Sequence, residues 1–126
     1  MAATGGTILW VGRGLCILAS LVFVMSAVMK FMGGEAVVEG MGHLGIPASL
    51  ILPLAILEIS CVVIYLIPAT AMLGAILLTG FLGGAILAHL RVGDPWFVQV
   101  ALGIVIWLGL WLQEGRLKSL LPLRKS

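Results

Sequence analysis

The stretch Ala48–Leu90, ASLILPLAILEISCVVIYLIPATAMLGAILLTGFLGGAILAHL, decides the fold. It is apolar almost throughout, and Glu58 is its one fully charged residue at neutral pH. Its length suffices for two membrane crossings of about 20 residues each. Because proline cannot continue a helix but suits the first turn of one, Pro68 predicts a helical hairpin with helices over 48–67 and 69–90.

Apolar segments on both sides of this hairpin complete the predicted fold. Ile8–Met29 is broken only by Arg13, and Trp96–Leu112 carries a single Gln99. The sequence therefore predicts an all-α membrane protein with four transmembrane helices, at about 8–29, 48–67, 69–90 and 96–112, in an antiparallel bundle. We expect residues 1–126 to form one transmembrane domain.

The composition excludes several other classes of protein. Of the 126 residues, 62% are apolar and 10% are charged, whereas soluble domains carry about 25% charged residues. The net charge of +2 comes from scattered basic residues, so we expect no nucleic-acid partner. Cys16 and Cys61 are too far apart in the chain for a zinc or thiol-exchange motif, and buried thiols are expected.

The basic residues predict an orientation in the membrane. Four crossings put both termini on one side, together with Arg13, Arg116, Lys118, Arg124 and Lys125, whereas Lys30 and Arg91 lie on the other. The positive-inside rule then favours cytoplasmic termini. A cleaved signal peptide over the first span is an alternative, but its only early positive charge is Arg13.

Polar and small residues recur at helical spacing and predict the inward faces, since polar side chains in lipid turn toward neighbouring helices. The four stripes are Arg13, Cys16, Ser20, Phe23, Ala27 and Lys30; Ala55, Glu58, Cys61 and Tyr65; Thr79, Ile86 and His89; and Gln99, Gly103, Ile106, Leu110 and Gln113. The third helix also carries a ladder of small residues, Gly80, Gly84 and Ala88, which would allow close packing and could support a homo-oligomer.

Glu58 is the most informative single residue. It lies ten positions into its span, roughly 15 Å deep at 1.5 Å per residue, which is near the middle of the bilayer. A carboxylate there costs several kcal/mol unless it is paired, neutralised or hydrated. We therefore expect a ligand-binding or proton-exchanging role; the alternative is a protonated side chain that links two helices.

Other polar residues gather at the end of the bundle away from the termini. Gly34–Leu44 predicts a short amphipathic helix in the first loop, with Glu35, Glu39 and His43 on its polar face. Glu39 and His43 have metal-ligand spacing, but a solvated face explains them better, so no metal is predicted.

Glu58 below and Lys30, His89 and Arg91 above would form a pocket that opens outward. Its walls would be apolar and its rim cationic, which suits a lipid-soluble ligand with a carbonyl or anionic head group, such as a quinone. The sequence contains no nucleophile or phosphate-loop motif, so no catalytic residue is assigned.

Three segments resemble the DoxX-like family of membrane proteins. They are Leu54–Pro95, which includes Glu58 and the turn AHLRVGDP, then Met25–Phe31 (MSAVMKF) and His43–Pro47 (HLGIP). The resemblance extends from the first helix to Gln113. It implies a small four-helix protein of the bacterial inner membrane, related to the small membrane subunit associated with thiosulfate:quinone oxidoreductase. By this resemblance Lys30, Glu58 and His89 match recurring polar positions, and Arg91 and Asp94 match the turn.

These observations together predict an accessory subunit of a membrane redox system that binds a quinone-like or other lipid ligand and docks a membrane or periplasmic partner protein. The thiosulfate-oxidising relatives use a second subunit that this chain lacks, so we do not expect catalysis by this chain alone. Two alternatives stay open: a small proton-coupled transporter that uses Glu58, and a structural scaffold.

Overall fold

The computed structural model describes residues 6–124, and these are helical over most of their length. The helices are α1 (Gly6–Met32), α2 (Glu35–His43), η1 (Ala48–Leu50), α3 (Ile51–Leu66), η2 (Pro68–Thr70), α4 (Ala71–Arg91), α5 (Phe97–Gln113) and α6 (Gly115–Lys118). The four predicted spans and the short helix of the first loop are confirmed. Lys125, which contributed to the charge count, lies outside the described residues.

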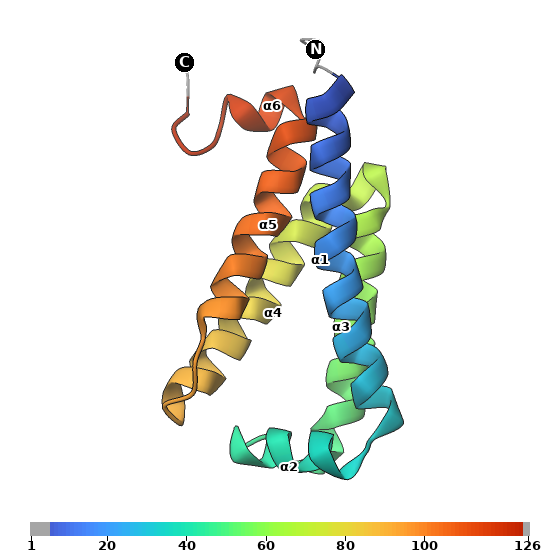
Figure 1. Ribbon diagram of the computed structural model, residues 1–126, viewed down its shortest axis with the longest axis vertical. Coiled ribbons are helices and arrows are strands. Elements are labelled where there is room, and N and C mark those ends of the chain that lie inside the picture. Colours follow the sequence, from blue (N-terminus) through green and yellow to red (C-terminus); the bar gives the residue numbers. More distant parts are fainter. Residues whose placement is uncertain (1–5, 125–126) are drawn as a thin grey trace.

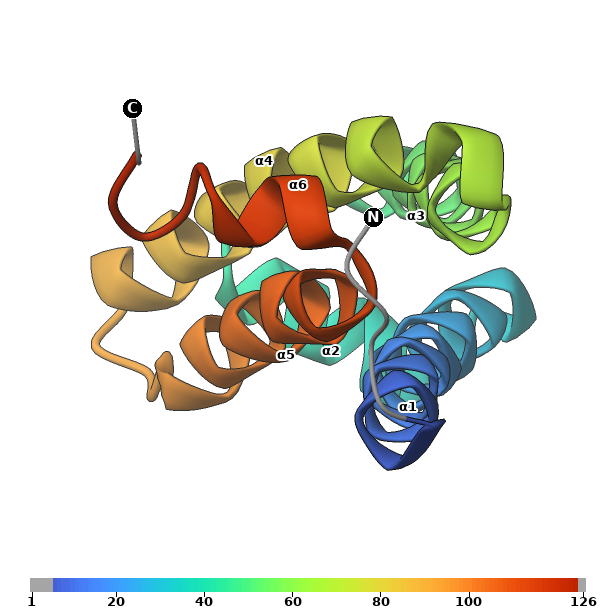
Figure 2. The same cartoon turned by 90° about the horizontal axis from the view of Figure 1, so that it is seen from above.

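The four long helices form an antiparallel bundle (Figure 1). Each packs against two neighbours, in the order α1, α3, α4, α5 around the bundle (Figure 2). Both ends of the chain lie at one end of the bundle, which we call the terminal end. Helix α2 lies across the opposite end, where α1 and α3 diverge from α4 and α5 (Figure 1). We call that half the α2 end.

The predicted hairpin between α3 and α4 forms at Pro68. Ile67 has extended backbone angles, and Pro68 opens the short 3-10 turn η2 that leads into α4. The hydroxyl of Thr70 donates to the carbonyl oxygen of Ile64 at 2.8 Å, so the side chain satisfies an acceptor that the end of α3 would leave open. The connection is thereby short enough to keep the two helices side by side.

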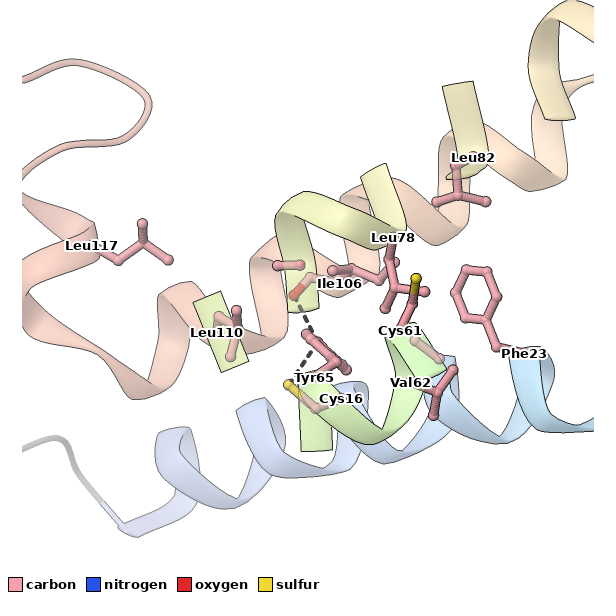
Figure 3. Packing of buried hydrophobic residues seen from close by; sticks show 12 residues of the cluster. Cys16, Phe23, Cys61, Val62, Tyr65, Leu78, Leu82, Ile106, Leu110 and Leu117 are labelled. Atoms are coloured by element: carbon pink, nitrogen blue, oxygen red, sulfur yellow. Dashed lines mark hydrogen bonds between the residues drawn. The ribbon is translucent and has the colours of Figure 1, made fainter. Parts of the chain in front are cut away.

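The core of the terminal half is packed around Tyr65. This side chain is 3% exposed, and its hydroxyl lies 2.9 Å from the carbonyl oxygen of Ile106 and 3.0 Å from Cys16 Sγ (Figure 3). Gln113 donates to the same sulfur at 3.3 Å. Cys16 and Cys61 are both free and buried, so the expected buried thiols are confirmed. Tyr65 thus links α3 to α1 and α5.

Glycines at the terminal end allow these helices to approach closely. A Cβ atom on Gly12 would lie 2.8 Å from the carbonyl oxygen of Gly109, and one on Gly109 would lie 2.7 Å from Cys16 Sγ. A Cβ atom on Gly74 would collide with the backbone of Tyr65. These positions therefore require glycine for contact between α1 and α5 and between α3 and α4.

Two details of the predicted inward faces are wrong. Arg13 is exposed and lies over the ring of Trp10 with its guanidinium 5.1 Å from the centroid, while its neighbour Gly12 is the buried residue. Gly80 and Gly84 are exposed, and no atom outside their own local helix lies within 4 Å of where their Cβ atoms would be. The close packing that the ladder suggested is provided by other glycines, because helix contact depends on which face meets a neighbour and not on glycine spacing alone.

The outer surface of the bundle is suited to lipid. Three helical stretches are long and apolar enough to cross a membrane, Gly6–Met32, Ala48–Leu66 and Pro68–Arg91, and Phe97–Gln113 is a shorter apolar helix. At 17 residues, this last helix lies at the lower end of the range that spans a bilayer. Large apolar side chains are exposed along all four helices. The protein is a multi-pass integral membrane protein.

Candidate functional site

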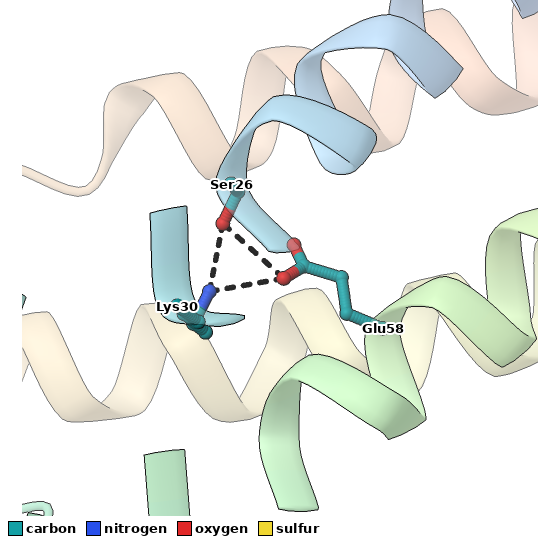
Figure 4. Close-up of polar contacts among 3 residues, drawn as sticks. All are labelled: Ser26, Lys30 and Glu58. Carbon is teal, nitrogen blue, oxygen red and sulfur yellow. Dashed lines mark hydrogen bonds and ion pairs between the residues drawn. The ribbon is translucent and has the colours of Figure 1, made fainter. Parts of the chain in front are cut away.

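Ser26, Lys30 and Glu58 form a polar cluster where α1 faces α3. Lys30 Nζ lies 2.9 Å from Glu58 Oε1 and donates to Ser26 Oγ at 2.7 Å, and the serine hydroxyl donates to the same carboxylate oxygen at 3.2 Å (Figure 4). Ser26 and Lys30 are four residues apart on α1, so they lie on one face of that helix. One turn of α1 therefore holds the carboxylate of α3 through two donors.

The cluster contains an ion pair that is largely buried. The side chain of Glu58 is 2% exposed and that of Lys30 is 10% exposed. A charge inside a membrane protein is very costly unless an opposite charge and hydrogen bonds compensate it. Lys30 also lies 6.0 Å from the ring centroid of Phe81, whose electron-rich face attracts a cation. Pairing of Glu58 thus explains how a carboxylate can lie within the bundle.

The cluster retains polar capacity for a bound molecule. Among residues 6–124, every hydrogen bond to the Glu58 carboxylate goes to Oε1, which leaves Oε2 without a partner there. The ammonium group of Lys30 has three N–H donors, and two are used by Ser26 and Glu58. One donor and one acceptor thus remain side by side for a ligand.

A second polar pair projects from the α4 and α5 wall. His89 Nδ1 lies 2.7 Å from the carbonyl oxygen of Ala85, a contact that requires the proton on Nδ1. In the neutral ring Nε2 is then an acceptor, and the amide nitrogen of Gln99 faces it at 3.5 Å.

These two polar pairs face one cavity inside the α2 half of the bundle. We call it the inner cavity; its volume is about 580 Å³. Helices α1 to α5 all contribute to its walls. Apart from a few polar residues, its lining is mainly aliphatic or aromatic. The polar residues that border it are Ser26, Lys30, Glu58, His89 and Gln99. Its size is within the range of small-molecule sites, about 300–1,000 Å³.

A more polar cavity of about 460 Å³ lies on the outer side of the same residues, beneath α2. We call it the outer cavity. Ser26, Lys30 and His89 border both cavities. The outer one is also lined by His43 and Asp94, whose side chains form an ion-pair contact with Nε2 and Oδ2 3.0 Å apart. This contact ties the end of α2 to the turn between α4 and α5.

The structure brings together only part of the predicted site. Lys30, Glu58 and His89 border the inner cavity, whereas Asp94 borders the outer one. Arg91 lines neither; it is exposed, and its guanidinium lies beside Gly45 after α2. The predicted place of Arg91 above Glu58 is therefore wrong: this long side chain at the end of α4 extends toward the loop instead of toward the interior.

Two residues of the site were not among the predicted candidates. Ser26 was the one polar side chain of the first helix left off the inward stripe, although its spacing of four from Lys30 indicates a shared face. Gln99 was assigned to an inward stripe but to no site. Both border the inner cavity.

The described part of the chain contains no group of three His, Cys, Asp or Glu side chains that could hold a metal ion. Of the two residues with metal-ligand spacing in the first loop, His43 contacts Asp94 instead. Glu39 is exposed on the polar face of α2. The arrangement is thus one of hydrogen-bond donors and acceptors around an apolar space.

Comparison with known proteins places this fold in a family. The sequence model of the DoxX-like family matches residues 14–113, which include α1 from its third turn onward, α2, α3, α4 and α5. The chain matches no curated protein and no solved structure. Since the match covers most of the chain and all residues that border the inner cavity, this integral membrane protein belongs to the DoxX-like family.

Proposed function

We propose that this protein binds a quinone-like ligand in the inner cavity and acts as an accessory subunit of a membrane redox system. The observation that supports it is a largely apolar cavity with polar groups on two of its walls, the Lys30–Glu58 pair from α1 and α3 and the His89–Gln99 pair from α4 and α5. A quinone ring is apolar on its faces and carries carbonyl oxygens on opposite edges. Such a ring needs apolar walls and a polar group at each end.

The residues can serve both carbonyl edges. The third N–H of Lys30 can donate to one oxygen, and Glu58 Oε2 can accept from the hydroxyl that forms when the ligand is reduced. On the other wall, His89 when protonated and the amide of Gln99 are donors. Phe23 and Phe81, which meet edge to face with centroids 6.4 Å apart, border the same cavity and can contact the ring.

The proposal includes a place in the cell. The basic residues Arg13, Arg116, Lys118 and Arg124 lie toward the terminal end and favour cytoplasmic termini in the bacterial inner membrane. The outer cavity and α2 would then face the periplasm, where the exposed carboxylates of Glu35 and Glu39 offer a polar surface to a partner protein. This side is where the electron-donating or electron-accepting partner would dock.

Binding of a quinone and of its reduced form to the purified protein tests the proposal, since Glu58 Oε2 can accept only from the reduced form. Glu58→Gln and His89→Ala should each weaken binding by about tenfold or more, the effect of losing a hydrogen bond to a charged group worth roughly 1.5–3 kcal/mol. Glu114→Gln, which changes a carboxylate outside both cavities, is the matched control and should bind as the wild type does. No binding by the wild type, or binding by both cavity variants that is as tight as that of the wild type, would refute the proposal.

Proton-coupled transport is the second candidate, because a carboxylate paired with lysine beside a cavity could exchange its partner for a proton. In vesicles, a transporter of this kind would drive efflux of a cationic dye in response to a proton gradient, and Glu58→Gln would abolish it. Quinone binding without dye efflux favours the redox role. If Glu58→Leu keeps both stability and phenotype, the protein is a scaffold.

A further inference from the structure

A second, more apolar space lies between α4 and α5 on the outside of the bundle. We call it the lateral groove; its volume is about 690 Å³. Its lining contains no charged residue, and its polar groups are few. The aromatic residues Trp107 and Trp111 form part of one wall, and the indole N–H of Trp107 is satisfied by Thr79 Oγ at 2.8 Å. Almost nothing in the groove is left to bind a polar group.

The groove and the inner cavity share a wall. Leu82 and Gln99 border both spaces. Leu82 reaches across to α5, where its Cδ1 atom lies 3.7 Å from the position that a Cβ atom on Gly103 would occupy. Side chains from α4 and α5 therefore form the separation between the two spaces at this point.

Glycines keep the groove open. Gly83 and Gly103 both border it, and a Cβ atom on Gly83 would have no neighbour within 4 Å. Close helix contact therefore does not explain Gly83, in contrast to Gly12, Gly74 and Gly109 at the terminal end. A larger side chain at 83 would extend into free space along the groove.

The groove runs toward the terminal end and is closed there by the chain itself. Along α5 it extends from Gln99 to Trp111, a rise of roughly 18 Å at 1.5 Å per residue. Trp111 Nε1 donates to the carbonyl oxygen of Leu121 at 2.9 Å, which holds the C-terminal segment against the end of the groove. The shape is that of a long, open, apolar groove beside the polar cavity.

We propose that the lateral groove holds the apolar tail of the ligand whose head group occupies the inner cavity, and that this ligand comes in from the bilayer between α4 and α5, past Leu82 and Gln99. The ligand class is thereby an amphiphile with a long alkyl or isoprenoid chain, such as a tailed quinone. The inference rests on the proposed function, because it assumes that a head group binds in the inner cavity.

The opposite route is unfavourable for such a tail. A ligand that left its tail toward α2 would pass it through the outer cavity, beside Lys30, His43 and Asp94. An apolar chain there would cover charged and polar groups, which would lose hydration without a partner, whereas the lining of the lateral groove contains no charged residue. The lateral route keeps the tail in contact with lipid or with the apolar groove throughout.

Two quinones that have the same ring test the inference. At the position of the tail, one carries a methyl group and the other carries a ten-carbon alkyl chain. Their affinities are measured for the purified protein in one detergent at constant concentration. The wild type should bind the tailed compound more tightly. Gly83→Leu should weaken its binding by about tenfold, the equivalent of displacing roughly two buried methylene groups, and should leave the methyl compound unaffected.

Gly14→Leu is the matched control. Gly14 lies on the exposed face of α1, a Cβ atom there would also have no neighbour within 4 Å, and it borders neither the groove nor the inner cavity. This variant should bind both compounds as the wild type does. A photoreactive group at the end of the chain gives a second readout, with labelling expected at Ile104 and Trp107 and not at Met41 and Leu44.

The outcomes separate the two proposals. If neither quinone binds the wild type, the proposed function fails. Three results would show that the head group binds but that the tail does not lie in the groove. They are equal binding of both compounds by the wild type, an equal effect of Gly83→Leu on both compounds, and labelling at Met41 and Leu44. If Gly83→Leu changes only the oligomeric mass, the groove accommodates a second copy of the chain and the inference is overturned.

Discussion

The two halves of the bundle use the same kinds of helix for different purposes. At the terminal end Gly12, Gly74 and Gly109 bring backbones into contact, and Tyr65 fills the centre. At the α2 end the helices diverge, the glycine at 83 has open space beside it, and the Lys30–Glu58 pair borders a cavity. The comparison teaches that one half supplies stability, which allows the other to keep a cavity and a buried ion pair.

The largest effect is expected from removal of the lysine that compensates Glu58. Lys30→Met leaves a carboxylate buried without a cation, which should lower the free energy of unfolding by about 3–5 kcal/mol, whereas Lys30→Met/Glu58→Met should recover much of that loss. Chemical denaturation in detergent micelles, followed by tryptophan fluorescence, measures both. Lys118→Met, which removes a cation 5.3 Å from the ring of Trp111, is the control and should cost about 1 kcal/mol or less.

The addition of one methyl group to a glycine of α4 should affect stability differently where the helix is packed and where it has free space. Gly74→Ala puts a Cβ atom into the backbone of Tyr65. This overpacking should lower the free energy of unfolding by about 3 kcal/mol or more, at or above the top of the usual range of about 1–3 kcal/mol. Gly80→Ala, on the same helix with free space around it, should be neutral or more stable by up to about 1 kcal/mol, because alanine favours the helix. Equal effects of the two changes on thermal unfolding would contradict the close approach at Gly74.

Tyr65→Phe should affect stability and leave ligand binding intact. It removes the hydroxyl that contacts Ile106 and Cys16 at the terminal end, so the free energy of unfolding should fall by about 1 kcal/mol. Quinone affinity should stay at the wild-type value, since Tyr65 does not border the inner cavity. A parallel loss of affinity would show that the two halves are not independent.

The smallest effect is expected at the surface of the terminal end. Hydrogen bonds from the Arg116 side chain and backbone lower the pKa of Glu114 from its ordinary value of 4.5. A lowered folded-state pKa contributes stability that is present above the ordinary value and is lost as pH falls through the folded-state value. The unfolding free energies of wild type and Glu114→Gln should therefore differ slightly near neutral pH and converge in acid; a difference that grows in acid would contradict the interaction.

Much of the fold and part of the site follow from local properties of the sequence. The hairpin at Pro68 and the four spans depend on chain length, hydropathy and proline chemistry, which act within a few residues. The burial of Glu58 on the stripe with Ala55, Cys61 and Tyr65 follows from helical period alone. These features were confirmed.

The positions of Ser26 and Arg91 in the structure could not be predicted from local properties of the sequence. Ser26 lies at the edge of the stripe and joins the site because its hydroxyl reaches Glu58 on another helix and accepts from Lys30. Arg91 belongs to the same helical turn as His89 but is exposed. Its guanidinium lies beside Gly45, because the loop that follows α2 comes close to the end of α4. Both outcomes depend on contacts between segments that are distant in sequence.

By itself the sequence determined the number of crossings, the short helix of the first loop and the burial of a charge, because an apolar bilayer leaves a helix little choice about which residues it can expose. Only the tertiary structure decided that Lys30 compensates this charge and that a cavity and a groove share Leu82 and Gln99. The reason is that these features depend on contacts between helices: glycines let the helices meet closely at one end, whereas at the other end the helices diverge and leave space between them.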